Sequence, residues 1–400
     1  MDFNWLNLLA LITLSAGHAA LVIGLVNRLH GLPFRRETLR ITRGLHDIVI
    51  VAFPLAVSWL VGVRGPRLLW SNDWARLPVP LLVYLGVCAA AMIALPLIAL
   101  RRRFARPVAA LISNHSHTVD IACELGRRPV GDGHHHWMAR LPGNELFQVQ
   151  VSEKNYRLPR LPANCDGLSI LHLSDFHFSG TPDRDYYERL VDLSQAMRPD
   201  LLIFTGDLLD RADLLDWLPS TFGRLSAPLG CYFVLGNHDW YIGRAEEIRR
   251  RLGEHGWCDV AGRCIMLESH GHSLAIAGSE RPWMGTQPSF DGAPEDSFRL
   301  LLSHTPDNIT WARRNRVDLM LAGHNHGGQV RLPLVGPVFS PSVFGCRYAS
   351  GVFWEPPTLL YVSRGISGQH PWRWRCPPEL TKLILRCNSE QRYNHDQSTI

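Results

Sequence analysis

LLIFTGDLLD, residues 201–210, is the stretch on which the fold assignment depends. Its first four residues form an apolar run of strand length, and the run ends in Gly206 and the two carboxylates Asp207 and Asp210. Burial of an unpaired charge is costly. A cation is therefore expected where this run ends.

Four other apolar runs of strand length end in a similar way. Helical segments separate the runs, which is typical of an α/β domain. The runs and the side chains that follow them are 168–173 before Asp175 and His177, 201–204 before Asp207, 232–235 before Asn237, His238 and Asp239, 300–302 before His304, and 319–321 before His324 and His326. Each run thus leads to a side chain that can bind a metal.

These side chains are expected to converge, because ligands of open α/β sheets bind beyond the carboxyl ends of the strands. The set comprises three oxygen donors and four imidazoles: Asp175, Asp207, Asn237, His177, His304, His324 and His326. This number of ligands suits two divalent ions that share one carboxylate. Oxygen and imidazole donors without thiolate favour Mn, Fe or Zn over calcium.

The same residues, in the same order, resemble the calcineurin-like metallophosphoesterases, whose pattern is D-x-H, G-D, G-N-H-D, H and G-H-x-H. The resemblance covers about residues 165–387. The strings GHNHGGQVRLP, VSRG and CPPEL are similar to a bacterial, membrane-associated branch of that family, which includes enzymes that act on phospholipid-like or nucleotide-diphosphate-lipid substrates. The resemblance to the family implies an α/β fold in which two mixed sheets pack face to face and are flanked by helices.

The resemblance also implies how the ligands divide between the two metals. Asp207 would bridge the ions. Asp175, His177 and His326 would complete one site, and Asn237, His304 and His324 the other. The chain departs from the family pattern at AGSER (277–281), where many relatives carry an acidic turn.

Several residues near these ligands are candidates for other roles. His238 is not needed as a ligand, so we expect it to protonate the leaving oxygen or to stabilise transition-state charge, with Asp239 as its orienting partner. Asp210 could accept a hydrogen bond from a ligand histidine, or it could be a carboxylate favoured at a helix N-terminus. Arg331 and Arg364 are candidate substrate phosphate ligands, and surface salt bridges are the alternative for each.

Three long apolar stretches, 5–26, 48–63 and 79–100, lie in the first hundred residues. Each is about long enough, the second with its flanks, to cross a bilayer of about 30 Å. A water-soluble bundle would alternate polar and apolar faces, which these stretches do not. The sequence therefore predicts three transmembrane helices, with the first one retained because it has no signal cleavage site.

Arginine placement predicts the orientation of these helices. Nine arginines lie in the first connection or after the third span: Arg28, Arg35, Arg36, Arg40, Arg43, Arg101, Arg102, Arg103 and Arg106. The second connection contains only Arg64, Arg67 and Arg76. The positive-inside rule then predicts a multi-pass inner-membrane protein whose chain is cytoplasmic after Leu100.

The predicted organisation is a membrane anchor over 1–104, a linker over 105–146, a metallophosphoesterase domain over 147–390 and a disordered tail over 391–400. GDGHHHW (131–137) is interpreted as a solvated loop, because adjacent histidines cannot all face one ion. WRWR (372–375) could contact lipid headgroups, which we favour slightly, or form an edge strand with its tryptophans inward. Nine scattered cysteines without a C-x-x-C pair suit reduced thiols in the cytoplasm.

The predicted function is that of a metal-dependent phosphodiesterase or pyrophosphatase, anchored to the bilayer and acting on an anionic, lipid-linked or nucleotide-diphosphate substrate. Within the resemblance, UDP-2,3-diacylglucosamine in lipid A biosynthesis is the specific candidate. A nuclease or a cyclic-nucleotide phosphodiesterase is an alternative. A nuclease would need a basic and aromatic groove for single strands, and no extended stretch of that type is evident outside the linker and the WRWR segment, so no nucleic-acid partner is expected. A catalytically inert membrane scaffold is the alternative from another class, and the intact ligand set argues against it.

Overall fold

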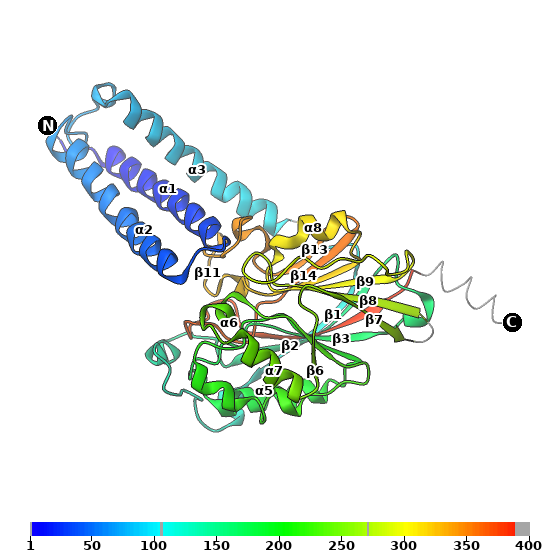
Figure 1. Ribbon diagram of the computed structural model, residues 1–400. Helices are drawn as coiled ribbons and strands as arrows, with labels where there is room; N and C mark the ends of the chain where they lie inside the picture. The colour runs from blue at the N-terminus through cyan, green and yellow to red at the C-terminus, as the bar shows by residue number, and fades with distance from the viewer. Residues whose placement is uncertain (1, 105–106, 270–271, 389–400) are drawn as a thin grey trace. The chain divides into compact units, whose positions relative to one another are not determined.

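The computed structural model describes residues 2–104, 107–269 and 272–388 (Figure 1). The chain forms two compact units. One comprises Met1–Arg106 and Leu332–Gly345, and the other comprises Pro107–Arg331 and Cys346–Ile400. The predicted tail at 391–400 lies outside the described residues.

The first unit is built on three long helices. They are α1 (Trp5–His30), α2 (Arg36–Val57), which a π-helical segment (Ser58–Arg64) extends, and α3 (Val79–Arg103). Three segments, Trp5–His30, Arg36–Arg64 and Val79–Arg102, are long and apolar enough to cross a membrane. Large apolar side chains such as Leu6 and Val79 are exposed on them, as expected of surfaces that face lipid.

Polar and small residues hold the three helices together. His18 of α1 is buried, and its Nδ1 atom lies 2.5 Å from the hydroxyl of Tyr84 in α3 while its Nε2 atom lies 3.0 Å from the carbonyl oxygen of Val49 in α2. A Cβ atom at Gly17 would lie 2.1 Å from the carbonyl oxygen of Cys88, so only glycine permits this approach of α1 to α3. Small residues and interhelical hydrogen bonds are the usual means of helix association in lipid.

The second unit contains two mixed sheets, which confirms the expected fold class (Figure 1). The seven-stranded sheet has the order β1-β2-β15-β3-β4-β5-β6. Its strands are β1 (Leu111–Asp120), β2 (Gln148–Arg157), β15 (Glu379–Arg386), β3 (Ser169–Leu173), β4 (Leu201–Phe204), β5 (Cys231–Phe233) and β6 (Trp257–Asp259). Strands β3 to β6 are parallel, so their carboxyl ends meet at one edge.

The six-stranded sheet has the order β13-β14-β10-β9-β8-β7. Its strands are β13 (Gly351–Glu355), β14 (Thr358–Val362), β10 (Leu319–Ala322), β9 (Phe298–Ser303), β8 (His272–Ser279) and β7 (Cys264–Ser269). The four central strands are parallel and the two edge strands are antiparallel to their neighbours.

Alternating side chains of the parallel strands form the core between the sheets and the layer beneath the helices. In β3, Ile170 belongs to the apolar cluster that both sheets form, whereas Leu171 belongs to the cluster that includes Leu190 of α5 (Arg184–Ala196) and Leu252 of α7 (Ala245–Glu254). Successive side chains of a strand point to opposite faces, so an apolar run of this kind is buried on both sides. This rigid double layer positions the loops at the strand ends.

The structure differs from the predicted linker at 105–146. Residues 111–120 form the edge strand β1, which pairs antiparallel with β2 and places Ser116 opposite Ser152. The sequence did not predict this strand, because most of its side chains, including His115 and His117, are polar and exposed. An edge strand with a solvated face carries no alternating apolar signal.

Candidate metal centre

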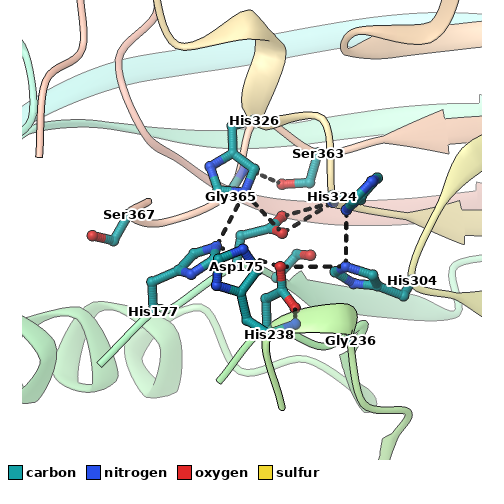
Figure 2. Close-up of polar contacts among 12 residues, drawn as sticks. Asp175, His177, Gly236, His238, His304, His324, His326, Ser363, Gly365 and Ser367 are labelled. Carbon is teal, nitrogen blue, oxygen red and sulfur yellow. Dashed lines mark hydrogen bonds and ion pairs between the residues drawn. The ribbon is translucent and has the colours of Figure 1, made fainter. Parts of the chain in front are cut away.

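All seven predicted ligands follow the carboxyl ends of parallel strands, and the structure brings them together. Figure 2 labels five of them, Asp175, His177, His304, His324 and His326. Asp175 and His177 follow β3, Asp207 follows β4, and Asn237 follows β5. His304 follows β9 of the other sheet, and His324 and His326 follow β10. The site thus lies where the ends of the central strands of both sheets meet.

Five of the seven ligand candidates have a left-handed backbone. Their φ angles are +55° at Asp175, +49° at His177, +58° at Asp207, +70° at His324 and +49° at His326. This conformation costs roughly 1–2 kcal/mol for an L-residue. Strain of this kind persists where the surrounding structure imposes it, and it clusters at functional sites.

The ligand atoms form two groups that share Asp207. The first group consists of Asp175, His177, Asp207 and His326. The Nε2 atoms of His177 and His326 are 3.1 Å apart, and His177 Nε2 lies 3.5 Å from Asp207 Oδ2. In the second group, His304 Nε2 lies 3.3 Å from Asp207 Oδ2 and 3.1 Å from His324 Nδ1. Asn237 Oδ1 is 2.9 Å from the same His304 nitrogen.

The chemistry of these donors fits metal ions. Asp207 Oδ2 and His324 Nε2 are buried without a hydrogen-bond partner among the described residues. Burial lowers the pKa of both His324 and His326, so these imidazoles are neutral and carry the lone pairs that metals need. Lone pairs that converge in a buried space would repel one another without a cation. The cluster can therefore hold metal ions.

The carboxylates of the cluster are ionised in spite of their burial. Burial by itself would raise the pKa of Asp175, but the neighbouring His326 lowers it below its usual range. Burial would also raise the pKa of Asp207, but His304 and His238 lower it below its usual range. Burial also opposes the charge on His304, yet the Asp207 carboxylate raises the His304 pKa to about 9.

His238 lies beside the cluster, and its partner is Asp210. The backbone N–H of His238 donates to Asp207 Oδ1 at 2.8 Å, and its Nδ1 atom lies 2.5 Å from Asp210 Oδ1. The other oxygen of Asp210 lies 3.1 Å from Nδ1 of His177. One carboxylate thus connects a ligand imidazole with His238, which agrees with the first of the two interpretations of Asp210.

Asp239 does not orient His238, contrary to our expectation. Its carboxylate accepts four backbone N–H groups, those of Gly236, Asp207, Leu208 and Leu209, at 2.9–3.1 Å. Burial and the neighbouring Asp207 charge nevertheless raise the pKa of Asp239 to about 7. Asp239 therefore ties the loop after β4 to the loop after β5.

The two arginines proposed to bind phosphate contact other parts of the protein. Nε of Arg364 lies 2.9 Å from Oε2 of the buried Glu379, and its NH2 atom donates to Gln150. Nε of Arg331 donates to the carbonyl oxygen of Gly327 at 2.9 Å, and its NH2 atom donates to Ser350. Both guanidinium groups thus brace loops beside the ligands.

Arg373 belongs to this site and was missed in the sequence. It is completely buried, and it donates to the carbonyl oxygens of His326 at 3.1 Å, of Arg364 at 2.7 Å and of Ser367. Burial lowers its pKa. The WRWR segment therefore places this arginine inward, whereas Trp372 and Trp374 are half-buried.

The loop that Arg373 holds contacts two ligands. A Cβ atom at Gly365, which Figure 2 labels beside Asp175, would lie 2.7 Å from Cβ of Asp175. A Cβ atom at Gly368 would lie 2.9 Å from Nδ1 of His326. The glycines let this loop approach the ligands, and Arg373 fixes its carbonyl groups. This loop therefore helps to position the side chains of Asp175 and His326.

Comparison with known proteins agrees with this geometry. The model of the calcineurin-like phosphoesterase family matches residues 168–328. An uncharacterized metallophosphoesterase, YkuE of Bacillus subtilis, is 29% identical over 60% of this chain and 87% of its own length. Phosphodiesterase YaeI of Escherichia coli is 29% identical over 58% and 86%. UDP-2,3-diacylglucosamine pyrophosphatase LpxG of Chlamydia muridarum is 28% identical over 63% and 92%.

Proposed function

We propose that this chain, which carries the calcineurin-like phosphoesterase domain of a metal-dependent phosphoester hydrolase, is a binuclear phosphodiesterase or pyrophosphatase anchored in the inner membrane. The observation that carries the proposal is the shared position of Asp207 in two groups of ligand atoms. Asp175, His177 and His326 would complete the first metal site. Asn237, His304 and His324 would complete the second, with Mn, Fe or Zn as the metal.

When bound, two such cations would lower the pKa of a water molecule and would neutralise charge on the phosphoryl oxygens. The chain's own residues would move the proton. The 2.5 Å contact with Asp210 keeps the proton of His238 on Nδ1 in the neutral ring, which leaves Nε2 for the reacting group. A second proton, taken up by Nε2 from solvent water, would pass to the leaving oxygen as the bond between that oxygen and phosphorus breaks, and the neutral ring would remain.

A lipid-linked nucleotide diphosphate is the proposed substrate class, with UDP-2,3-diacylglucosamine as the specific candidate. The similarity to the UDP-2,3-diacylglucosamine pyrophosphatase LpxG, which this chain matches over 92% of the LpxG length, supports the assignment. Three helices that could cross a membrane support it as well, because an anchored enzyme meets a substrate that stays in the bilayer. The arginine distribution favours a cytoplasmic catalytic unit.

Purified full-length protein with manganese, tested in parallel on an aryl phosphodiester, UDP-2,3-diacylglucosamine and a cyclic nucleotide, would test the proposal. We expect hydrolysis of the lipid nucleotide, and its loss in Asp207→Ala and His238→Ala with the fold retained. Asp213→Ala is the matched control, because that carboxylate is exposed and pairs with Arg211. Wild-type turnover by either site variant contradicts the assigned roles. Inactivity on all three substrates would favour an inert scaffold.

A further inference from the structure

The segment Leu332–Gly345 follows the last block of ligands in the chain, yet it belongs to the helical unit. Its centre is fixed to α1 by the buried Asn27, whose Nδ2 atom donates to the carbonyl oxygen of Val338 at 3.0 Å and whose Oδ1 atom accepts the N–H of Ser340 at 3.1 Å. The ring of Phe339 lies 5.7 Å from that of His30 and 4.9 Å from the guanidinium of Arg43. The segment is therefore an ordered part of this unit.

The tip of the segment exposes a large apolar side chain. Strands β11 (Arg331–Leu332) and β12 (Gly336–Pro337) form a two-stranded ribbon, and Leu334 lies in its turn. Leu334 is 89% exposed, more than any other large apolar side chain in the part of the chain that the structure describes. Its φ of +65° is left-handed, which is rare for an apolar L-residue. A strained turn that presents leucine to solvent suggests a function.

Cationic side chains from all three helices lie along the segment. A Cβ atom at Gly345 would be 3.6 Å from Arg28 of α1, and one at Gly336 would be 4.0 Å from Arg102 of α3. Arg43 of α2 contacts Phe339, and it also pairs with Asp47 at 3.2 Å. Residues 332–345 themselves contain no charged side chain. An exposed apolar side chain next to arginines is suited to the headgroup layer of a bilayer that contains anionic lipid, because the arginines attract the lipid phosphates.

We propose that Leu332–Gly345 is an interfacial segment that inserts Leu334 into the headgroup layer of an anionic phospholipid bilayer, where Arg28, Arg43 and Arg102 face the lipid phosphates. This inference rests on the membrane anchoring proposed above and adds a second type of membrane contact. The three helices already suffice for anchoring. Leu332 follows His326 by six residues, so the insertion would tether the loop that bears His324 and His326 within about 20 Å of chain from the lipid surface.

Photocrosslinking in nanodiscs tests the insertion without reference to activity. Full-length protein carrying p-benzoylphenylalanine in place of Leu334 should form phospholipid adducts, and phosphatidylglycerol should increase their yield over phosphatidylcholine alone. Met266, an exposed apolar residue of β7, is the negative control, and Leu6 of α1, which is 78% exposed, is the positive control. Adducts at Leu6 without adducts at Leu334 overturn this inference. The absence of adducts at Leu6 overturns the membrane anchoring itself.

The kinetic consequence can be measured separately. Leu334→Asp should raise KM for a lipid-linked substrate in vesicles by about tenfold, the expected effect of losing one inserted leucine. The kcat for a soluble aryl phosphodiester should not change, because Leu334 is an exposed apolar side chain of the helical unit and is not among the ligand candidates. Met266→Asp should leave both values unchanged. An unaltered KM in Leu334→Asp, or an equal rise in Met266→Asp, overturns the inference.

Discussion

Oδ1 of Asp210 lies 2.5 Å from Nδ1 of His238. The second oxygen of the same carboxylate contacts the ligand candidate His177 at 3.1 Å. Burial opposes the charge on Asp210, but His238 and His177 lower its pKa below its usual range. The carboxylate is therefore ionised at neutral pH and can hold both imidazoles in one tautomer.

Asp210→Asn should lower kcat by roughly 10²- to 10⁴-fold, because the amide can hold His238 in the wrong tautomer. Steady-state kinetics on an aryl phosphodiester would measure the loss, and metal analysis would show whether His177 still supports binding. Asp213→Asn is the control, since this exposed carboxylate pairs with Arg211. A variant with unchanged kcat and unchanged metal content would contradict the role of Asp210.

Asp239→Asn should destabilise the fold by about 2–4 kcal/mol. The amide nitrogen cannot accept hydrogen bonds, so two of the four backbone N–H groups now bound by Asp239 would lose their acceptor. Urea denaturation of the metal-free protein would measure the change, which separates this effect from catalysis. A loss of activity with unaltered unfolding free energy would restore Asp239 to a catalytic role.

Arg373→Lys should weaken manganese binding although the charge is conserved. Lysine cannot reproduce the planar fork that donates to the carbonyl groups of His326, Arg364 and Ser367. We expect metal affinity to fall about 10- to 100-fold, as for other supports of ligands. Titration calorimetry would measure it. The exposed Arg375→Lys is the control, and equal affinities of the two variants would show that Arg373 does not position His326.

Removal of the metal should lower the melting temperature. Ligand binding to the folded state stabilises it by about 2.7 kcal/mol at a free concentration of 100 Kd. For a unit of this size, that corresponds to roughly 5–10 °C. Calorimetry with chelator and with added manganese would show the difference. The shift should shrink in His304→Ala, because one of the paired groups would lose a ligand.

Asp318→Asn should change how stability depends on pH. Burial raises the pKa of Asp318 to about 6, from an ordinary value of 3.8. Between these values the folded state retains a proton that the unfolded state releases, so Asp318 makes the protein less stable as pH rises from about 4 to 6. The amide still accepts the Arg299 N–H at the 2.8 Å contact and does not titrate. The stability of the variant relative to wild type should therefore increase over this interval, as measured by urea denaturation at several pH values.

Part of the site could be predicted because strand ends are local features. D-x-H, G-D, G-N-H-D, H and G-H-x-H each follow an apolar run, and parallel strands bring their carboxyl ends together whatever their order in the sheet. The three apolar stretches were equally evident, because the thickness of a bilayer sets their length. The grouping of the ligands around Asp207 is consistent with the division that the family resemblance implied.

The tertiary structure alone decided which polar groups support the ligands. Asp210 and Asp239 stand close to ligands in the chain, and only the fold determines that the first faces His238 and the second faces backbone N–H groups. Arg373 became part of the site because loops far apart in sequence enclose it. Hydrogen-bond partners depend on positions in space, whereas patterns of apolar residues depend only on neighbours in the chain. The sequence by itself therefore determined the α/β class and predicted the candidate donors, and the folded chain decided what orients them.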